Sequence, residues 1–435
     1  MNSLKVRMEI SGSSVFVGEI FYKSSEDAVF QYAEEYLNLS ISVPISISLP
    51  LQSNSFTPAQ TKNFFEGLLP EGFTRRAVAQ WLRVDESDYL SILKGLGSEC
   101  LGAIQIIDED YKENSRYEKL TLEEVKALAN EGAVKSAAIM TETHLSLAGA
   151  SGQVGLYFDE GSGNWFLPKG LAPSTHIVKQ SHVRLKNIVA NEQLTLMTAK
   201  KLGINIAESF IVNLGAGEDE NVLLASKRYD RCFTDDVKLV DSLPCPLRLH
   251  QEDFAQALGI SSANKYERKG DNYLLKCFEL LRKYSTNPLE DRAEFFRRII
   301  YNYLVGNTDG HIKNFSLLYT SDLKSVRLAP AYDLISTTVY KEGTRKMSLY
   351  LENECLIDAI NKEIITHSAQ KVGIGSRLAG SILDTMANSF ESALRESAEE
   401  LEEQGFRNAM HIANLIMQTG GICKCCMLHS NKMLN

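Results

Sequence analysis

Long apolar runs are missing from this chain of 435 residues, although 44% of the residues are hydrophobic. Since a membrane-spanning helix needs roughly 18 or more consecutive apolar residues, we expect no such helix and no membrane partner. The N-terminal residues also lack the apolar stretch of a signal peptide. The sequence therefore predicts a cytoplasmic protein, long enough for about two to four packed units.

Basic residues are not in excess either. Lys and Arg total 46 against 55 Asp and Glu, which gives a formal net charge of -9. Because binding of nucleic acid requires clustered Lys and Arg against the phosphates, a chain this acidic is a poor nucleic-acid binder on its own. A local basic patch stays compatible with this net charge.

Cysteine is sparse, with 8 residues, and its spacing does not match a known metal site. Without a secretion signal, reduced thiols are expected. Cys423, Cys425, Cys426 and His429 gather near the C-terminus but lack the two-plus-two spacing of a zinc finger. We expect residues 421–435 to form a disordered, cysteine-containing tail, with a zinc site as the alternative.

The periodicity of apolar residues divides the remaining chain into three predicted domains. Residues 1–108 form a small α+β unit with strands at 4–10, 14–22, 41–47 and 103–107 and helices at 61–69 and 75–84. Residues 109–248 form a mixed domain with a helix at 121–131, opened by a Thr-Leu-Glu-Glu capping box. This domain continues with strands at 156–159, 175–179, 208–214 and 222–229 and a helix at 188–202.

Residues 249–420 form the third predicted domain, in which helical periodicity predominates. The expected helices span residues 251–258, 273–284, 289–305, 362–371, 377–404 and 406–418. A mixed part followed by a helical part is the order of a two-lobed protein kinase. The fold class that we expect is therefore α+β.

The segment 306–314, Gly-Asn-Thr-Asp-Gly-His-Ile-Lys-Asn, carries the most informative pattern. Asp309, four intervening residues and Asn314 match the spacing of a protein-kinase catalytic loop. There the Asp accepts the proton of the attacking hydroxyl, and the Asn holds a magnesium ion. A second acid, Asp333, follows downstream as a candidate for the other metal ligand. The alternative is an ordinary Asp-Gly turn capped by Asn.

Two further parts of a kinase have candidates in the mixed domain. Gly149, Gly152 and Gly155 lie three residues apart, where small residues let backbone N–H groups approach phosphate oxygens. The alternative is a turn that joins two strands. Lys179 ends a predicted strand and suits the α and β phosphates of a nucleotide; its alternative is an exposed charge at a sheet edge.

The last two candidates concern the positioning of that lysine and the adenine. Glu192 lies on the predicted helix 188–202 and is either the acid that positions Lys179 or an exposed carboxylate. Residues 225–231, Ala-Ser-Lys-Arg-Tyr-Asp-Arg, would join the lobes and bind adenine through the backbone, with Tyr229 over its face. Arg228 and Asp230 are equally compatible with a structural ion pair.

Together these residues resemble the HipA family, the serine/threonine kinase toxins of bacterial type II toxin-antitoxin systems, which are associated with bacterial persistence. The resemblance extends to about residue 418. It rests on the motifs at residues 46–52, 63–70, 97–103, 145–150, 168–170, 175–179, 191–192, 228–231, 250–254, 306–316 and 331–335.

The resemblance implies a two-lobed, HipA-like kinase fold with an extra N-terminal subdomain and an all-helical C-terminal lobe. It implies ATP and Mg²⁺ as cofactors. It assigns catalytic roles to Asp309 and Lys313, and metal binding to Asn314 and Asp333. The nucleotide-binding residues that it implies are Ser146, Ala148, Gly149, Ala150, Ser151, Gly152, Lys179, Glu192, Lys227, Tyr229 and His311.

The family also implies regulation and partners. Self-silencing by phosphorylation of a loop serine would fall on Ser146, with Ser151 as a second acceptor. A small DNA-binding antitoxin, HipB-like, would neutralise the kinase and recruit it to operator DNA. The protein substrate would be an aminoacyl-tRNA synthetase or another translation factor.

One residue departs from the family pattern. HipA kinases carry a lysine two residues after a glutamine in the glycine loop, and this chain has Gln153 there instead. The chain therefore lacks one cation near the phosphates. Our first hypothesis is an active kinase toxin; the alternatives are a catalytically weak corepressor that binds the antitoxin and a small-molecule phosphotransferase.

Overall fold

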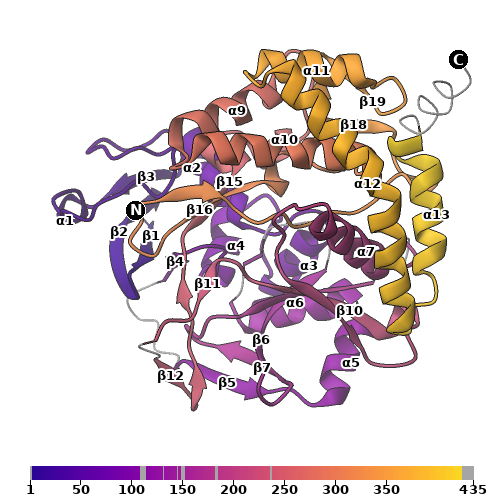
Figure 1. Ribbon diagram of the computed structural model, residues 1–435. Coiled ribbons are helices and arrows are strands. Elements are labelled where there is room, and N and C mark those ends of the chain that lie inside the picture. The colour runs from indigo at the N-terminus through magenta and orange to yellow at the C-terminus, as the bar shows by residue number, and fades with distance from the viewer. Residues whose placement is uncertain are drawn as a thin grey trace, which may run out of the picture. The chain divides into compact units, whose positions relative to one another are not determined.

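A computed structural model describes residues 2–107, 114–130, 132–144, 146–147, 152–181, 185–235 and 238–423 (Figure 1). The chain forms two compact units that alternate along the sequence. Unit 1 contains Met1–Gln180, Ala225–Ala263 and Ser316–Val326. Unit 2 contains Ser181–Leu224, Asn264–Phe315 and Arg327–Asn435. The predicted boundaries near residues 108, 248 and 420 stay predictions.

Unit 1 begins with a four-stranded sheet in the order β3-β2-β1-β4. Its strands are β1 (Asn2–Ile10), β2 (Ser13–Tyr22), β3 (Val29–Tyr32) and β4 (Ile104–Ile106). Ile10 pairs with Ser13, so the turn has two central residues, Ser11 and Gly12, both with positive φ (49° and 80°). Such turns match the right-handed twist of the strands that they join. The strands expected at residues 4–10 and 14–22 are confirmed, and this turn joins them into a hairpin.

Helices α1 (Glu34–Leu37), α2 (Pro58–Phe65), α3 (Gly72–Leu82) and α4 (Tyr89–Leu96) follow in unit 1. The strand expected at residues 41–47 is wrong, because these residues form a loop. Two tyrosine hydroxyls satisfy its backbone: Tyr32 accepts from the Ile45 N–H (2.9 Å), and Tyr36 accepts from the Val43 N–H (3.1 Å). A β-branched run without a partner strand therefore finds its hydrogen bonds elsewhere.

A second sheet of unit 1 contains the adjacent strands β5 (Arg116–Lys119), β7 (Asn164–Lys169), β6 (Gln153–Asp159) and β8 (His176–Gln180). Helices α5 (Leu122–Asn130) and α6 (Gly132–Glu142) lie between β5 and β6 in sequence, and α6 packs against α3 and β6. The expected capping box is present, since Thr121 Oγ1 accepts from the Glu124 N–H (3.3 Å) and Glu124 accepts from the Thr121 N–H (2.7 Å).

The later part of unit 1 contains short elements. These are β11 (Arg231–Cys232), β12 (Leu239–Val240), β13 (Leu243–Pro244), β14 (Leu247–Arg248), β15 (Gln251–Asp253), α8 (Phe254–Ala257) and β16 (Ser316–Tyr319). A single helix was expected over 251–258, but residues 251–253 pair with β16 and only residues 254–257 are helical. Glu252 of β15 accepts hydrogen bonds from Ser46 (2.5 Å) and Tyr319 (2.6 Å), and burial raises its pKa to about 7.

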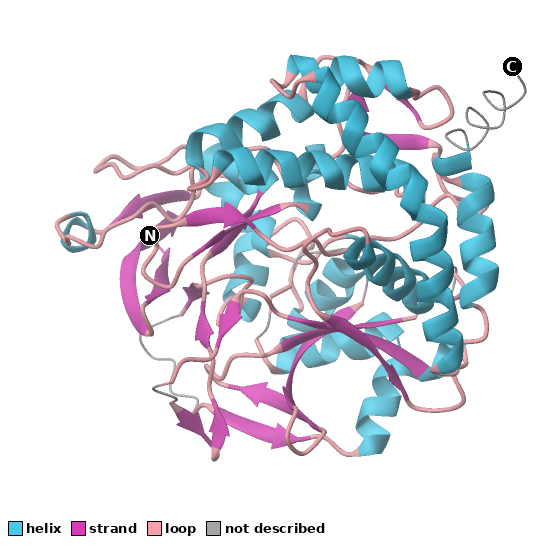
Figure 2. Ribbon diagram, in the orientation of Figure 1, coloured by secondary structure: helices cyan, strands magenta, loops and turns pink. Residues whose placement is uncertain are grey.

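Unit 2 is mainly helical, with α7 (Ile188–Lys201), α9 (Tyr273–Tyr284), α10 (Pro288–Val305), α11 (Lys362–Lys371), α12 (Ser376–Glu403) and α13 (Ala409–Thr419) (Figure 2). The long helix α12 packs against α7, α10, α11 and α13. The helices expected in this region of the sequence are confirmed, apart from 251–258.

Short strands also occur within residues 249–420, where an all-helical lobe was expected. Besides β15 and β16, they are β17 (Val326–Leu328), β18 (Lys346–Leu351) and β19 (Glu354–Leu356). Strand β9 (Ser209–Asn213) confirms the strand expected at residues 208–214. Strand β10 (Val222–Lys227) carries the chain from unit 2 back into unit 1. The α+β class is confirmed.

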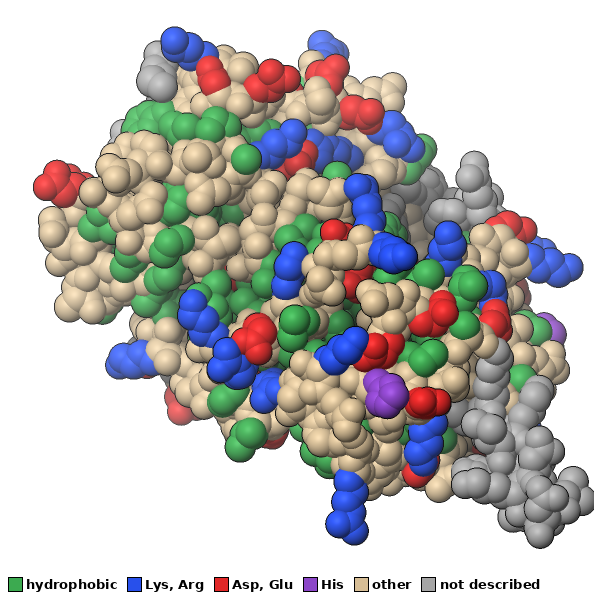
Figure 3. Space-filling view, turned by 90° about the horizontal axis from the view of Figure 1, so that it is seen from above, with side chains coloured by type: hydrophobic (Ala, Val, Ile, Leu, Met, Phe, Trp, Pro, Cys, Tyr) green, Lys and Arg blue, Asp and Glu red, His purple; other side chains and the backbone are tan. Residues whose placement is uncertain are grey.

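Two surface properties bear on possible partners. Within the described residues, the structure contains no helix that combines the length and the apolar character needed to cross a membrane. Figure 3 shows Lys and Arg side chains interspersed with Asp and Glu side chains on the face that it displays.

Candidate functional site

The end of helix α10 sets the start of the segment 306–314. Gly306 follows the last helical residue with φ 75°, a left-handed conformation that strongly favours glycine. A Cβ atom on Gly306 would lie 2.1 Å from Thr338 Oγ1, so a side chain does not fit. The Gly306 carbonyl accepts hydrogen bonds from the N–H groups of Thr337 (3.0 Å) and Thr338 (3.1 Å). These contacts fix the direction in which the chain leaves the helix.

An asparagine pair holds the backbone of Asp309. The side chain of Asn302 on α10 accepts from Asn307 Nδ2 (3.1 Å), and Asn307 Oδ1 accepts from the Asp309 N–H (3.1 Å). A Cβ atom on Gly310 would lie 2.6 Å from Asn302 Nδ2, so a side chain at this position would displace the Asn302 amide. The loop is therefore built onto the helix rather than left as a free surface turn.

Asn314 is drawn toward Asp309 within the same segment. Its Nδ2 donates to the Asp309 carbonyl (3.1 Å), and its backbone N–H donates to the His311 carbonyl (2.8 Å). The amide nitrogen is engaged in the loop, while the amide oxygen is the kind of atom that magnesium binds. The alternative of an Asp-Gly turn capped by Asn describes this local geometry equally well, so the loop shape alone does not assign the chemistry.

Asp333 lies on a neighbouring segment of unit 2. Tyr332 donates its hydroxyl to the Lys313 carbonyl (3.0 Å), so the residues just before Asp333 and just before Asn314 are hydrogen-bonded to each other. Asp333 has φ 55°, a left-handed conformation that Asp tolerates better than most residues. Backbone strain at a polar residue is typical of functional sites.

The donor set of Asn314 and Asp333 fits a magnesium ion. Magnesium prefers oxygen ligands, keeps several water molecules and needs only one or two protein groups beside the substrate phosphates. The described residues contain no cluster of three or more His, Cys, Asp or Glu side chains suited to a metal cage. If Asn314 and Asp333 bind magnesium as predicted, water and nucleotide phosphates would complete its coordination.

Two other predicted residues of the loop are buried. His311 is 6% exposed and Lys313 is 7% exposed. The His311 ring meets the ring of Tyr266 edge-on, with centroids 5.2 Å apart. Tyr266 also donates a hydrogen bond to Asp309, a contact that sequence reasoning missed. A tyrosine in a loop before a helix carries no sequence signal for such a contact.

In unit 1, Lys179 lies in β8 directly opposite Gln153 of β6. The residue that departs from the family pattern is thus the cross-strand neighbour of the predicted phosphate-binding lysine. Side chains in such pairs lie roughly 5 Å apart at Cβ, so a second lysine there would repel Lys179. Gly155 pairs with Ile177 within the same sheet and belongs to the strand rather than to a loop.

Ser146 is fully buried in unit 1. Its hydroxyl donates to the Leu68 carbonyl (2.7 Å), and its N–H donates to the Glu99 carbonyl (2.7 Å). Gly152, which precedes β6, is also buried. Ala148, Gly149, Ala150 and Ser151 lie outside the described residues, as do residues 424–435 with most of the predicted cysteine tail.

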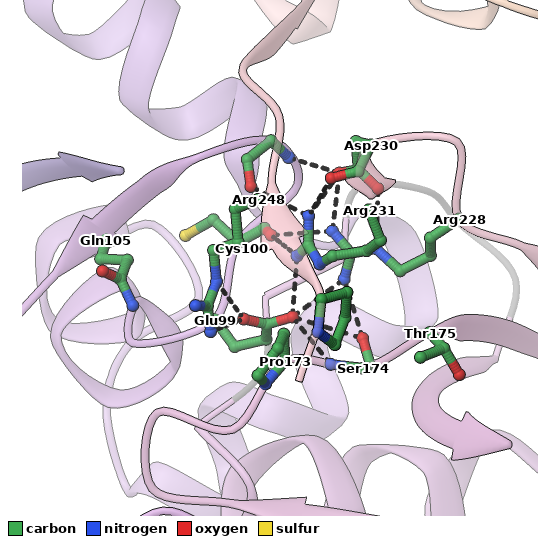
Figure 4. A network of polar contacts seen from close by, with 12 residues as sticks. Glu99, Cys100, Gln105, Pro173, Ser174, Thr175, Arg228, Asp230, Arg231 and Arg248 are labelled. Atoms are coloured by element: carbon green, nitrogen blue, oxygen red, sulfur yellow. Dashed lines mark hydrogen bonds and ion pairs between the residues drawn. The ribbon is translucent and has the colours of Figure 1, made fainter. Parts of the chain in front are cut away.

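The predicted adenine-binding segment is anchored by a buried ionic cluster (Figure 4). Arg228 forms an ion pair with Asp230 (2.8 Å), which realises the structural alternative left open by the sequence. Glu99 lies at the centre of the cluster and accepts from Arg228 (3.2 Å), Arg231 (2.8 Å) and Arg248 (2.6 Å). Asp230 also accepts from the Gly102 N–H (2.6 Å).

The electrostatics of Glu99 follow from this arrangement. Burial by itself raises the pKa of Glu99, but the guanidinium groups of Arg248, Arg231 and Arg228 outweigh it and hold the pKa well below its usual range. At pH values above the usual pKa of a carboxyl group, Glu99 therefore contributes fully to stability. This contribution is lost as the pH falls through the depressed pKa.

The other predicted nucleotide-binding residues lie in less specialised surroundings. Lys227 forms an exposed ion pair with Glu160 (3.0 Å). Tyr229 is half-buried and donates its hydroxyl to Gln251. Glu192 on α7 is 6% exposed, so the alternative of an exposed helix carboxylate is wrong. The nucleotide-binding roles of these residues stay predictions.

Two family models cover most of the chain. The HipA N-terminal domain matches residues 8–107, and the HipA-like C-terminal domain matches residues 145–394. The protein Y4mE of Sinorhizobium fredii is 31% identical over 396 residues, which cover 89% of this chain and 90% of Y4mE. The chain belongs to the HipA family.

Two comparisons with Shewanella oneidensis proteins agree with this assignment. The serine/threonine-protein kinase toxin HipA of that organism is 25% identical over 403 residues, 89% of this chain and 88% of the relative. A solved structure of the Shewanella oneidensis HipA, HipB and operator DNA complex matches with a TM-score of 0.77 and 22% identity. The match covers 95% of this chain and 96% of that chain, so the fold is HipA-like.

Replacement of Glu99 by Gln tests the ionic cluster in this HipA-family chain. Glu99→Gln should lower the free energy of unfolding by about 3–5 kcal/mol, because it leaves buried arginines without their counter-ion. Urea unfolding of the variant and the wild type measures the difference. Glu123→Gln is the control, since the Glu123 side chain is 82% exposed and its loss should matter by less than about 0.5 kcal/mol. Equal stability of Glu99→Gln and Glu123→Gln would contradict the prediction.

Proposed function

We propose that this HipA-family protein is an ATP- and Mg²⁺-dependent serine/threonine protein kinase that acts as a growth-inhibiting toxin in the cytoplasm. The observation that carries the proposal is the anchored segment 306–314, in which Asn314 donates to the Asp309 carbonyl. Tyr332, next to Asp333, is hydrogen-bonded to the same segment. A base and two oxygen ligands for a metal thus belong to two connected segments of unit 2.

The reaction would run as an in-line displacement on the γ-phosphate. Asp309 accepts the proton of a serine or threonine hydroxyl, whose oxygen forms the new bond to phosphorus while the bond to the β-phosphate oxygen breaks and ADP leaves. Asn314 and Asp333 would hold magnesium, which would offset the negative charge of the phosphates. Lys313 steadies the transferred phosphoryl group, and Lys179 binds the α and β phosphates.

Gln153 supports the alternative function, that of a catalytically weak, kinase-like corepressor. The neutral amide opposite Lys179 provides no additional positive charge for the phosphates. The positive charge around the phosphates would then have to come from Lys179, Lys313 and magnesium alone. This arrangement is compatible with slow catalysis or with nucleotide binding without catalysis.

For partners, we propose a HipB-like DNA-binding antitoxin and, through it, operator DNA. The support is the match to the Shewanella oneidensis HipA, which was solved in complex with HipB and operator DNA. This chain has a net charge of -9, so its basic residues are not in excess. The antitoxin would supply the basic surface that binds the DNA phosphates. An aminoacyl-tRNA synthetase or another translation factor is the substrate class that we propose.

Transfer of labelled phosphate from ATP to proteins of a cell lysate tests the proposed function. In the presence of Mg²⁺ we expect labelled protein bands, and chelation of the metal should abolish them because the metal offsets phosphate charge. Label only in small molecules would identify a small-molecule phosphotransferase. ATP binding without any transfer would favour the corepressor and would contradict the kinase.

Ser146 provides a second prediction, on self-silencing. Its hydroxyl is buried and donates to the Leu68 carbonyl, so phosphorylation requires this segment to leave its observed position. A phosphate would then add a charge of about -1.5 to -2 near the nucleotide phosphates and should block ATP binding. Mass spectrometry should find phosphate on Ser146 or Ser151 in the wild type and not in Asp309→Ala. Phosphate at Ser146 in Asp309→Ala expressed alone would reject self-modification.

A further inference from the structure

Tyr266 contacts the predicted catalytic base directly. It lies in unit 2, in the loop that precedes α9, and its hydroxyl donates to Asp309 Oδ1 at 2.7 Å. The side chain is 46% exposed, which by itself is typical of an ordinary surface tyrosine. The contacts around it distinguish Tyr266 from such a residue.

The ring of Tyr266 is held by the same loop that carries Asp309. The ring meets His311 edge-on, with an angle of 78° between the ring planes, a geometry that aromatic pairs prefer. Lys265 places its ammonium group 5.4 Å from the centroid of the Tyr266 ring. Hydroxyl and ring therefore contact residues 309 and 311 together, which restricts the orientation of the phenol.

The backbone beside Tyr266 is anchored by Glu267, which is 8% exposed. The Glu267 carboxylate accepts from the N–H groups of Tyr273 (2.9 Å) and Tyr350 (2.7 Å). Its own N–H donates to the Ser348 carbonyl (3.1 Å), and the Ser348 hydroxyl donates to the Thr308 carbonyl (2.6 Å). Strand β18 thus fixes both the residue after Tyr266 and the residue before Asp309.

We propose that Tyr266 is a positioning residue of the phosphotransfer reaction, which orients the Asp309 carboxylate by holding Oδ1. The proposal rests on the kinase function proposed above. An ionised carboxylate can accept several hydrogen bonds, so the bond from Tyr266 is compatible with a further bond from the acceptor hydroxyl.

Tyr266→Phe isolates the hydroxyl, since the ring over His311 is retained. With ATP and a protein acceptor, we expect kcat to fall about 10- to 100-fold, the usual cost of releasing a positioned group, while KM for ATP stays unchanged. The acid limb of the pH–rate profile should move to higher pH. Tyr284→Phe at the exposed end of α9 is the matched control and should leave both quantities unchanged.

A second readout does not depend on turnover. In protein carrying ¹³C at the Asp carboxyl carbons, the Asp309 signal is the one that disappears in Asp309→Asn. Its titration midpoint should move to higher pH in Tyr266→Phe and not in Tyr284→Phe, because the ionised form loses a hydrogen bond. This midpoint reports the hydrogen bond to Asp309 itself, and the change in kcat reports its role in transfer.

The outcomes separate this inference from the kinase proposal. Unchanged kcat and an unmoved midpoint in Tyr266→Phe would overturn the positioning role. A higher kcat would also overturn it, because the phenol would then compete with the acceptor hydroxyl. A wild type that transfers no phosphate would defeat the kinase proposal and the positioning role together, and the midpoint would still report whether the contact with Asp309 exists.

Discussion

The burial of Glu99 is the constraint on which the organisation of unit 1 depends. Its side chain is 2% exposed and balances three arginines, two of which, Arg228 and Arg231, flank the predicted adenine-binding residue Tyr229. Its carbonyl accepts from the N–H of Ser146, at the start of the predicted phosphate loop. One residue of the N-terminal sequence motif therefore fixes both segments that the nucleotide would contact.

The buried ionic cluster around Glu99 carries a desolvation cost in free energy, so a role besides stabilisation is needed to explain it. Removal of charges from water costs several kcal/mol per ion, and a well-packed apolar replacement is often as stable. The cluster fixes the positions of backbone segments: Asp230 accepts from the Gly102 N–H, and Arg228 donates to the Cys100 carbonyl. Phosphoryl transfer also requires groups in defined positions, because the protein contributes mainly position and charge to this reaction.

In unit 2, the Asp309 loop is held in position by interactions of a different kind. Hydrogen bonds of neutral groups hold the Asp309 loop: Asn302 of α10 accepts from Asn307 of the loop, Asn307 accepts from the Asp309 N–H, and the Ser348 hydroxyl of β18 donates to the Thr308 carbonyl. Glycines at 306 and 310 allow the close approach of backbone that these bonds require. These neutral groups maintain the shape of the loop that carries the predicted catalytic residues.

Local patterns in the sequence predicted those parts of the fold and site that depend on neighbouring residues. The spacing of Asp309 and Asn314, the hairpin at Ser11 and the capping box at Thr121 all follow from a few adjacent positions. Residues 41–47 and 251–253 were predicted incorrectly because their hydrogen-bond partners are tyrosine hydroxyls and a strand far away in the sequence. The ion pair of Arg228 with the nearby Asp230 was one of two alternatives that the sequence left open. The contacts of Arg228 with Glu99 and of Tyr266 with Asp309 were missed, because those partners are distant in the sequence.

The most direct test of the central claim is single-turnover transfer of phosphate from saturating ATP to a protein acceptor, measured for the wild type and for Asp309→Gln. The account predicts that Asp309→Gln transfers phosphate at least about 100-fold more slowly, because the acceptor hydroxyl loses its general base. ATP affinity and the unfolding midpoint should stay at their wild-type values, since Asp309 is half-buried in a loop anchored by its backbone. Transfer by Asp309→Gln at the wild-type rate would contradict the assignment of Asp309 as the base.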